Sequence, residues 1–439
     1  MKKRLTSFQI IMFGFLIVIF AGTILLMLPF STKDFAGASW RDALFTATSA
    51  VCVTGLVVQD TALYWSSFGQ VVILMMIQIG GMGVVTIAVS VAMLSGRKIG
   101  LMQRSTMQEA IAAPQVGGIV RLTGFILKAT VAIELIGALI MFPVFYGEMG
   151  MKKGIWYSVF HSVSAFCNAG FDLMGFQGAF SSLTSFQDNP VINLTIMILI
   201  IIGGIGFLTW DDMRNKKLHF HKYRLQSKLI LSVTVILILL PAIYFYFGEF
   251  THFPQKERIL CSLFQSVTPR TAGFNTTDLT ELSETGIALM IVLMLVGGSP
   301  GSTAGGIKTT TLAVLFLTVV AVFRRREDAQ IFDRRISVNA IRSAAAILIM
   351  YLILFLTGGM VISRVEGIPL LSCLFEAASA IGTVGLTLGI TSKLGMISRG
   401  ILVFLMFFGR VGCLTLVYAT IAGTKIHSSR LPQEKITVG

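Results

Sequence analysis

The sequence predicts an all-α membrane protein made of four repeats, each with a crossing helix, a half-helix, a glycine-bearing loop and a second crossing helix. Two observations lead to this prediction. First, 54% of the 439 residues are hydrophobic and only 13% are charged, whereas about 25% are charged in ordinary soluble domains. Second, one short motif recurs four times along the chain.

Eight apolar runs are long enough to cross about 30 Å of hydrocarbon as helices. The runs cover residues 8–30, 69–94, 120–146, 191–210, 226–247, 286–323, 340–363 and 397–422. The first run follows the letters MKKR. It is too long for the apolar part of a signal peptide and lacks a small-residue cleavage site, so we expect the cell to retain it. Eight crossings place both chain ends on one side of the membrane.

Lysine and arginine indicate which side that is. If both ends are cytoplasmic, the inside segments hold 22 of the 35 basic residues and the outside segments hold ten, while Lys128, Lys308 and Arg410 fall within spans. This bias predicts a multi-pass protein of the cell membrane with a cytoplasmic N-terminus and C-terminus. Membrane topology and contact with anionic lipid account for the net charge of +14, so it gives no reason to expect nucleic acid.

The cysteine and histidine residues show no metal-site or redox pattern. The five cysteines lie in or beside apolar stretches without C-x-x-C spacing. We therefore expect neither disulfides nor zinc. Among the histidines, only His219 and His221 are closely spaced, in a basic loop where we expect them to be solvated.

The recurring motif begins with Phe, carries a Ser or Thr among small residues, and ends with Gly followed by Leu or Phe. Its four copies are FTATSAVCVTGL (45–56), FHSVSAFCNAGF (160–171), FQSVTPRTAGF (264–274) and FEAASAIGTVGL (375–386). The closing glycines are Gly55, Gly170, Gly273 and Gly385, spaced 115, 103 and 112 residues apart. Each copy lies between spans and is too short to cross a bilayer.

Non-helical backbone at membrane depth is tolerated only where protein buries it or where it lines a watery cavity. Four such loops are expected to face a common axis, where glycine allows unusual φ and carbonyl oxygens can point inward. Rings of carbonyls replace the hydration shell in potassium filters, and TVG at 383–385 matches the start of TVGYG. The alternative is that the glycines only permit close helix packing. The expected filter residues are Val53, Thr54, Gly55, Asn168, Ala169, Gly170, Thr271, Ala272, Gly273, Thr383, Val384 and Gly385.

A second glycine motif follows the first in three of the repeats. It has the form G-G-x-G-x-x-T in GGMGVVT (80–86) and GGIGFLT (203–209), and GRVGCLT (409–415) has one change. The third repeat begins with Gly297 and Gly298 and then departs. A dinucleotide fingerprint needs a third glycine and a preceding strand, and both are missing. We expect these glycines to allow tight helix packing under the loops.

The stretch GGSPGSTAGGIKTTT (297–311) invites comparison with a phosphate-binding loop. Gly301 and Gly306 have the required separation, but Ile307 stands where the motif needs Lys, and an apolar run without strand punctuation precedes it. We therefore expect no nucleotide on this chain. Glycine costs about 1 kcal/mol and proline about 3 in a helix, so this stretch is predicted to interrupt the span.

Arg410 is a charge in the middle of a span, which is costly unless it faces water or a partner. It stands where the first two repeats have Gly81 and Gly204, so we expect it in the cavity just under the filter, near the carbonyls of 297–306. The alternative is a structural ion pair, for example with Glu134. On the outer side, Asp60, Asp172 and Asp278 follow their filter glycines closely, either to concentrate cations or as solvated loop charges.

Together these motifs resemble the potassium-transporting membrane subunit of the Trk/Ktr/HKT superfamily, most closely the bacterial Ktr type. The resemblance covers nearly the whole chain. It implies four covalently linked membrane-pore-membrane units around a pseudo-fourfold pore, a homodimer, K⁺ as the substrate and Na⁺ as a candidate activator. The implied units are residues 1–95, 96–215, 216–330 and 331–424, followed by a cytoplasmic tail at 425–439.

The resemblance also implies a gate below the filter, formed by an intramembrane loop together with an arginine. In this sequence the gate residues are Gly297, Gly298, Ser299, Pro300, Gly301, Ser302, Thr303, Ala304, Gly305, Gly306, Lys308 and Arg410. The alternative is a kink without a gating role. The implied partner is a cytoplasmic ring of nucleotide-binding RCK subunits, for which the basic loops 211–228 and 324–342 are candidate contacts.

The predicted activity is therefore channel-like K⁺ uptake, with no enzymatic step. The rival is a secondary transporter that couples K⁺ to Na⁺ or H⁺, because broken helices near the midplane suit such proteins. Transporters of that kind usually have inverted repeats, whereas these four repeats share one orientation.

Overall fold

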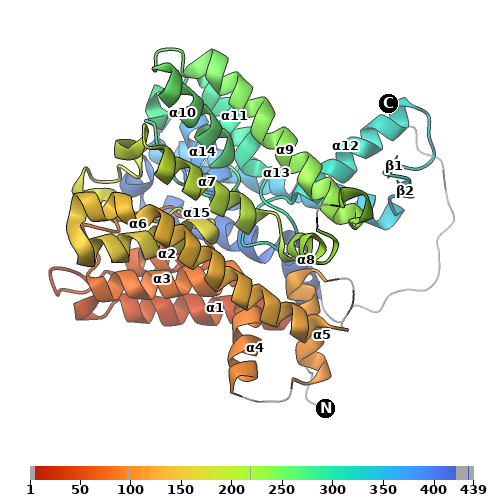
Figure 1. The fold of residues 1–439 in the computed structure, drawn as a ribbon, viewed down its shortest axis with the longest axis horizontal. Coiled ribbons are helices and arrows are strands. Elements are labelled where there is room, and N and C mark those ends of the chain that lie inside the picture. Colours follow the sequence, from red (N-terminus) through yellow and green to blue (C-terminus); the bar gives the residue numbers. More distant parts are fainter. Residues whose placement is uncertain are drawn as a thin grey trace.

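The computed structural model describes residues 5–95, 99–113, 115, 117–217, 219–421 and 434. The expected tail at 425–439 lies outside the described residues except for residue 434. Helices dominate the described chain, and the long ones run side by side across the molecule (Figure 1). In Figure 1, α4 and α5 project below the bundle and α12 lies at its upper right.

Each repeat has the same order of elements, and their bounds are as follows. The first holds α1 (Ser7–Leu26), α2 (Trp40–Val51), α3 (Ser67–Met82) and α4 (Val84–Leu94), and α5 (Leu101–Ile111) follows it. The second holds α6 (Ile119–Phe166), α7 (Pro190–Gly204) and α8 (Phe207–Lys216). The third holds α9 (Leu225–Tyr244), α10 (Gln255–Val267), α11 (Glu284–Leu295) and α12 (Thr309–Phe323). The fourth holds α13 (Val338–Glu366), α14 (Leu370–Gly382), α15 (Met396–Val411) and α16 (Cys413–Ile421).

The half-helices α2, α10 and α14 precede the filter segments of repeats one, three and four. In the second repeat, α6 contains both the crossing helix and the half-helix. The two parts are separated by a kink at Gly150, which has φ 75° and ψ −180°. Glycine adopts this conformation without steric cost. Residues 151–166 therefore form the half-helix, and the repeat keeps the predicted order.

Three of the eight predicted spans, 69–94, 191–210 and 397–422, are bent. Their helices bend by 96°, 95° and 93° between α3 and α4, α7 and α8, and α15 and α16. The bends fall at Gly83, Gly206 and Gly412, whose φ values are 85°, 89° and 90°. Because L-residues rarely adopt this φ, the last glycine of each G-G-x-G motif permits the turn.

Serine residues initiate several of the helices in the usual way. Serine side chains accept hydrogen bonds at the start of α3 from Gly69 N and at the start of α11 from Gly286 N. A two-stranded hairpin, β1 (Gln330–Ile331) with β2 (Arg334–Arg335), joins α12 to α13. This hairpin was not predicted from the sequence.

Candidate functional site

The four repeat glycines form a closed ring. A Cβ atom placed on Gly55 would lie 3.1 Å from the Cα of Gly170, and one on Gly170 would lie 2.9 Å from the Cα of Gly273. A Cβ atom on Gly273 would lie 3.2 Å from the Cα of Gly385, and one on Gly385 would lie 3.0 Å from the Cα of Gly55. Residues more than 100 positions apart in sequence therefore meet around one point, with no room for a side chain between them.

The backbone has the same unusual conformation in all four segments. Each glycine has positive φ, and so does the non-glycine residue two positions before it. These residues are Val53 (50°), Asn168 (58°), Thr271 (67°) and Thr383 (52°). Left-handed backbone is uncommon for threonine and valine, and strained conformations of this kind persist where the surroundings enforce them and where function uses them.

Buried hydroxyl groups hold these segments in place. The hydroxyl of Ser49 accepts a hydrogen bond from Gly55 N (3.1 Å), and that of Ser379 accepts one from Gly385 N (3.0 Å). In the second repeat Ser164 donates to the carbonyl of Phe171 (2.7 Å), and in the third Thr268 donates to that of Phe274. Each copy of the motif carries a Ser or Thr, but this role was not predicted from the sequence. The constant position of the hydroxyl residue, four residues after the opening Phe, could have indicated it.

The first glycine of each G-G-x-G motif packs directly beneath a filter segment. A Cβ atom on Gly80, Gly203 or Gly409 would collide with a backbone carbonyl oxygen of the neighbouring segment. Those oxygens belong to Val51, Phe166 and Ile381, each four residues before its filter glycine. The expectation of tight helix packing is therefore correct for the first glycine of each motif, whereas the last glycine permits the bend described above.

The four glycines line a small cavity of about 100 Å³, which we call the outer cavity. Asp60 and Asp172 line it together with the four glycines, whereas Asp278 instead caps a short helical turn through Thr280 N (2.9 Å). Burial raises the pKa of Asp172 to about 7, and the neighbouring Asp60 carboxylate also raises it, against the lowering effect of the Met174 N–H. The mouth thus combines two carboxylates, one of them titrating near neutral pH.

Between α11 and α12 the chain is non-helical, as the glycines and Pro300 predict. This intramembrane loop, residues 296–308, bonds to the glycine-rich ends of helices from other repeats. Ser299 N donates to the carbonyl of Gly204 (2.9 Å), and Phe207 N donates to that of Gly301 (2.7 Å). Because α7 ends at Gly204 and α8 begins at Phe207, the loop fills the bend between these two helices.

The intramembrane loop also touches two filter segments. The hydroxyl of Thr303 donates to the carbonyl of Phe166 (3.1 Å). A Cβ atom on Gly305 would collide with the side chain of Thr383, so glycine is needed for this approach. The loop therefore lies against the base of the second and fourth filter segments, on the side opposite the outer cavity.

Two basic side chains hold the intramembrane loop through its backbone. Arg410 donates to the carbonyl oxygens of Thr303, Gly80 and Gly81, the last at 3.0 Å. Lys308 donates to the carbonyls of Ala304 (2.7 Å) and Gly305 (3.0 Å) within the loop. The Arg410 contacts match the expectation that this residue lies near the loop carbonyls, and Lys308 ties two carbonyls of the loop together.

The alternative of an ion pair between Arg410 and Glu134 is wrong. The carboxylate of Glu134 accepts a hydrogen bond from the side-chain amide of Gln78 (3.3 Å). Arg410 instead faces a cavity of about 370 Å³ below the loop, which Lys308 and Pro300 also line. A cation that left the ring toward this side would meet both the loop and the guanidinium.

Comparison with known proteins places this geometry in a family. The model of the TrkH family, described as cation transport protein, matches residues 3–429. The chain belongs to this family. It is a membrane subunit of the Trk/Ktr type, and the prediction of an all-α protein of four repeats is confirmed.

Two relatives match over nearly their whole length. The potassium/sodium uptake protein NtpJ of Enterococcus hirae is 40% identical, covering 100% of this chain and 98% of the relative. The Ktr system potassium uptake protein B of Bacillus subtilis is 39% identical, covering 99% and 97%. The crystal structure of the potassium transporter TrkH from Vibrio parahaemolyticus has the same fold, with a TM-score of 0.71 at 21% identity, covering 93% of this chain and 85% of that one.

Proposed function

We propose that this subunit carries out K⁺ uptake across the cell membrane through a channel-like pore whose filter is the ring of four glycine-bearing segments. The observation that carries the proposal is the closed ring of Gly55, Gly170, Gly273 and Gly385. The names of the relatives from Enterococcus hirae and Bacillus subtilis, both potassium uptake proteins, support the choice of ion.

In this proposal K⁺ sheds water at the ring, where backbone carbonyls of the filter segments replace its hydration shell. The close approach of the glycines supports a narrow passage, and the buried hydroxyls support a rigid one. Asp60 and Asp172 would raise the local concentration of cations at the outer mouth. None of these steps makes or breaks a covalent bond, so the chain would act without enzymatic chemistry.

The intramembrane loop and Arg410 would form the gate. The loop lies against the base of the filter, and the Arg410 guanidinium fixes it while placing a positive charge beside the path. Opening would require the loop to leave Arg410, Phe166 and Gly204, which breaks several hydrogen bonds at once. Such a bistable contact suits a regulated pore.

Regulation would come from outside the chain. The resemblance to the Ktr type supports a cytoplasmic RCK ring, and the name of the Bacillus subtilis relative, a Ktr system protein, agrees with a multi-component assembly. Both termini would be cytoplasmic, and two copies of the subunit would form a homodimer. The proposed repeats are residues 1–95, 96–215, 216–330 and 331–424.

A second candidate is a coupled symporter of K⁺ with Na⁺ or H⁺. The three sharp helix bends favour it, because discontinuous helices form ion sites in secondary transporters. The name of the Enterococcus hirae relative includes sodium as well as potassium. Under this candidate, uptake would show a fixed coupling ratio.

Flux of ⁸⁶Rb⁺ into proteoliposomes of the purified chain separates the two candidates. A channel-like pore predicts that Rb⁺ moves down its own gradient without Na⁺ or a proton gradient. A fixed number of Na⁺ or H⁺ ions moved with each Rb⁺ would instead establish the symporter. Absence of Rb⁺ flux with and without those gradients would contradict both.

A further inference from the structure

A broad groove of about 990 Å³ opens on the surface between α4, α6 and α8. We define it as the basic groove, because Arg121, Lys128 and Arg214 line it beside the apolar side chains of Met93, Val120 and Phe125. None of the residues that line it belongs to the filter segments or to the proposed gate. We propose that the basic groove binds the phosphate headgroup of an anionic phospholipid from the adjoining leaflet.

The three cations of the basic groove are free to meet an anion. All three side chains are exposed, and none forms an ion pair with a carboxylate in the described part of the chain. The guanidinium of Arg214 lies over the ring of Phe125, 4.5 Å from its centre. This stacking fixes the charge in position and leaves the guanidinium edge available for hydrogen bonds.

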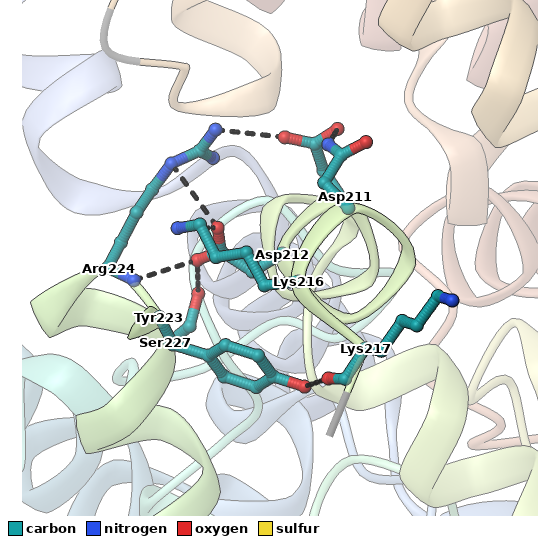
Figure 2. Close-up of polar contacts among 8 residues, drawn as sticks. Asp211, Asp212, Lys216, Lys217, Tyr223, Arg224 and Ser227 are labelled. Atoms are coloured by element: carbon teal, nitrogen blue, oxygen red, sulfur yellow. Dashed lines mark hydrogen bonds and ion pairs between the residues drawn. The ribbon is translucent and has the colours of Figure 1, made fainter. Parts of the chain in front are cut away.

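Two neighbouring basic residues, Arg224 and Lys216, are already paired with carboxylates. Figure 2 shows Arg224 bonded to Asp211 at 2.9 Å, with Asp212 also within reach, while Lys216 pairs with Asp212 at 2.7 Å. The buried Asp212 additionally accepts hydrogen bonds from Ser227 and from Arg224 N. The carboxylates of Asp211 and Asp212 are thus occupied by Arg224 and Lys216 and do not neutralise the cations of the basic groove.

The walls of the basic groove match an amphipathic ligand. A smaller adjoining pocket of about 310 Å³ shares Arg121 and Arg214 and adds Asn215 and the paired Asp211 and Arg224. In the other direction, Val131, Leu135 and Leu139 continue the Lys128 face of α6, and they are 52%, 55% and 70% exposed. They follow Lys128 at helical spacing, so they form one apolar strip.

A phospholipid fills all of these surfaces at once. Its phosphate would meet the three cations, its polar headgroup would enter the adjoining pocket, and its acyl chains would lie along the apolar strip of α6. A soluble anion would leave the strip uncovered. Basic pockets between membrane helices bind anionic headgroups in this way. That the leaflet is the cytoplasmic one depends on the orientation proposed above, whereas binding itself does not.

Native mass spectrometry of the full-length protein in a neutral detergent tests the proposal. The probes are phosphatidylglycerol and phosphatidylcholine with identical acyl chains. The triple variant Arg121→Gln, Lys128→Gln and Arg214→Gln should bind phosphatidylglycerol roughly a hundredfold more weakly, at about 1 kcal/mol for each cation. The matched control, with Arg324, Arg325 and Arg326 each changed to Gln, removes the same charge elsewhere and should bind it like the wild type.

The proposal is overturned if the triple variant retains wild-type affinity for phosphatidylglycerol, or if the control loses as much affinity as the triple variant. It is also overturned if phosphatidylcholine binds as tightly as phosphatidylglycerol. Glycerophosphoglycerol, which has the headgroup but no acyl chains, should not compete at equal concentration; equal competition would assign the groove to soluble phosphates instead. If the triple variant fails to fold, the single change Lys128→Gln at an exposed position gives the same comparison.

Discussion

The guanidinium of Arg410 on α15 donates a hydrogen bond to the backbone carbonyl of Thr303 in the intramembrane loop. This contact joins the fourth repeat to the third, and the same guanidinium reaches the carbonyls of Gly80 and Gly81 in the first. Three repeats are thereby tied together immediately below the ring of filter glycines. The proposed gate is closed by this contact.

Replacing Arg410 by Ala should raise basal ⁸⁶Rb⁺ flux in proteoliposomes. Hydrogen bonds to charged groups contribute about 1.5–3 kcal/mol each, so losing them should favour the open loop by roughly tenfold or more. The variant Arg342→Ala, which removes an exposed cation on α13, serves as the control. Unchanged flux in Arg410→Ala would show that the contact does not limit passage.

Deletion of residues 299–306 should also raise basal flux, because these residues include most of the loop that lies against the second and fourth filter segments. The effect should exceed that of Arg410→Ala, since the obstruction itself is removed. Size-exclusion chromatography establishes that the protein remains assembled. If an assembled deletion variant has wild-type flux, the loop is no gate.

The substitution Gly55→Ser should admit Na⁺. Gly55 has a φ of 89°, and a Cβ there would approach the Cα of Gly170 to 3.1 Å, so the ring must widen or distort. We expect the ratio of Rb⁺ to Na⁺ flux to fall by at least roughly tenfold, equivalent to about 1.4 kcal/mol. Gly100→Ser, at a glycine with no atoms near its Cβ position, should leave the ratio unchanged. Retained selectivity in Gly55→Ser would argue against the ring as filter.

Uptake should depend on external pH through Asp172. Because burial raises the pKa of Asp172 to about 7, its negative charge is present above that pH and is lost as pH falls through it. Initial Rb⁺ uptake at low Rb⁺ concentration should therefore decrease from pH 8 to pH 6. The titratable groups near this carboxylate include Asp60, which also lines the mouth, and Tyr157, which interacts electrostatically with Asp172.

The control for this pH dependence is Asp172→Asn, which removes the titrating group and keeps its shape. Its uptake should be lower than wild type at pH 8 and should change little between pH 8 and pH 6. A variant that keeps the full pH dependence would place the titration elsewhere.

The overall fold followed from the sequence because hydropathy and a repeated motif are encoded locally. The meeting of the four glycines was also predictable, since buried non-helical backbone needs a shared cavity. The bends at Gly83, Gly206 and Gly412 were not, because the apolar run extends past each glycine, by only four residues at Gly206, and hydropathy is the same for straight and bent helices.

Other features depended on contacts that spacing alone does not encode. The role of Ser49 and Ser379 follows from the left-handed backbone that brings the filter amides to their hydroxyls. Similarly, the sequence left the partner of Arg410 open between loop carbonyls and Glu134. The structure identifies the partner, because Glu134 accepts a hydrogen bond from Gln78 and Arg410 donates one to the carbonyl of Thr303.

The most direct test of the central claim is anomalous X-ray scattering from crystals of the protein grown in Rb⁺. We expect an Rb⁺ peak at the centre of the ring formed by Gly55, Gly170, Gly273 and Gly385. This peak should disappear when Na⁺ replaces Rb⁺. Rb⁺ peaks elsewhere in the membrane region, with none inside the ring, would contradict the central claim.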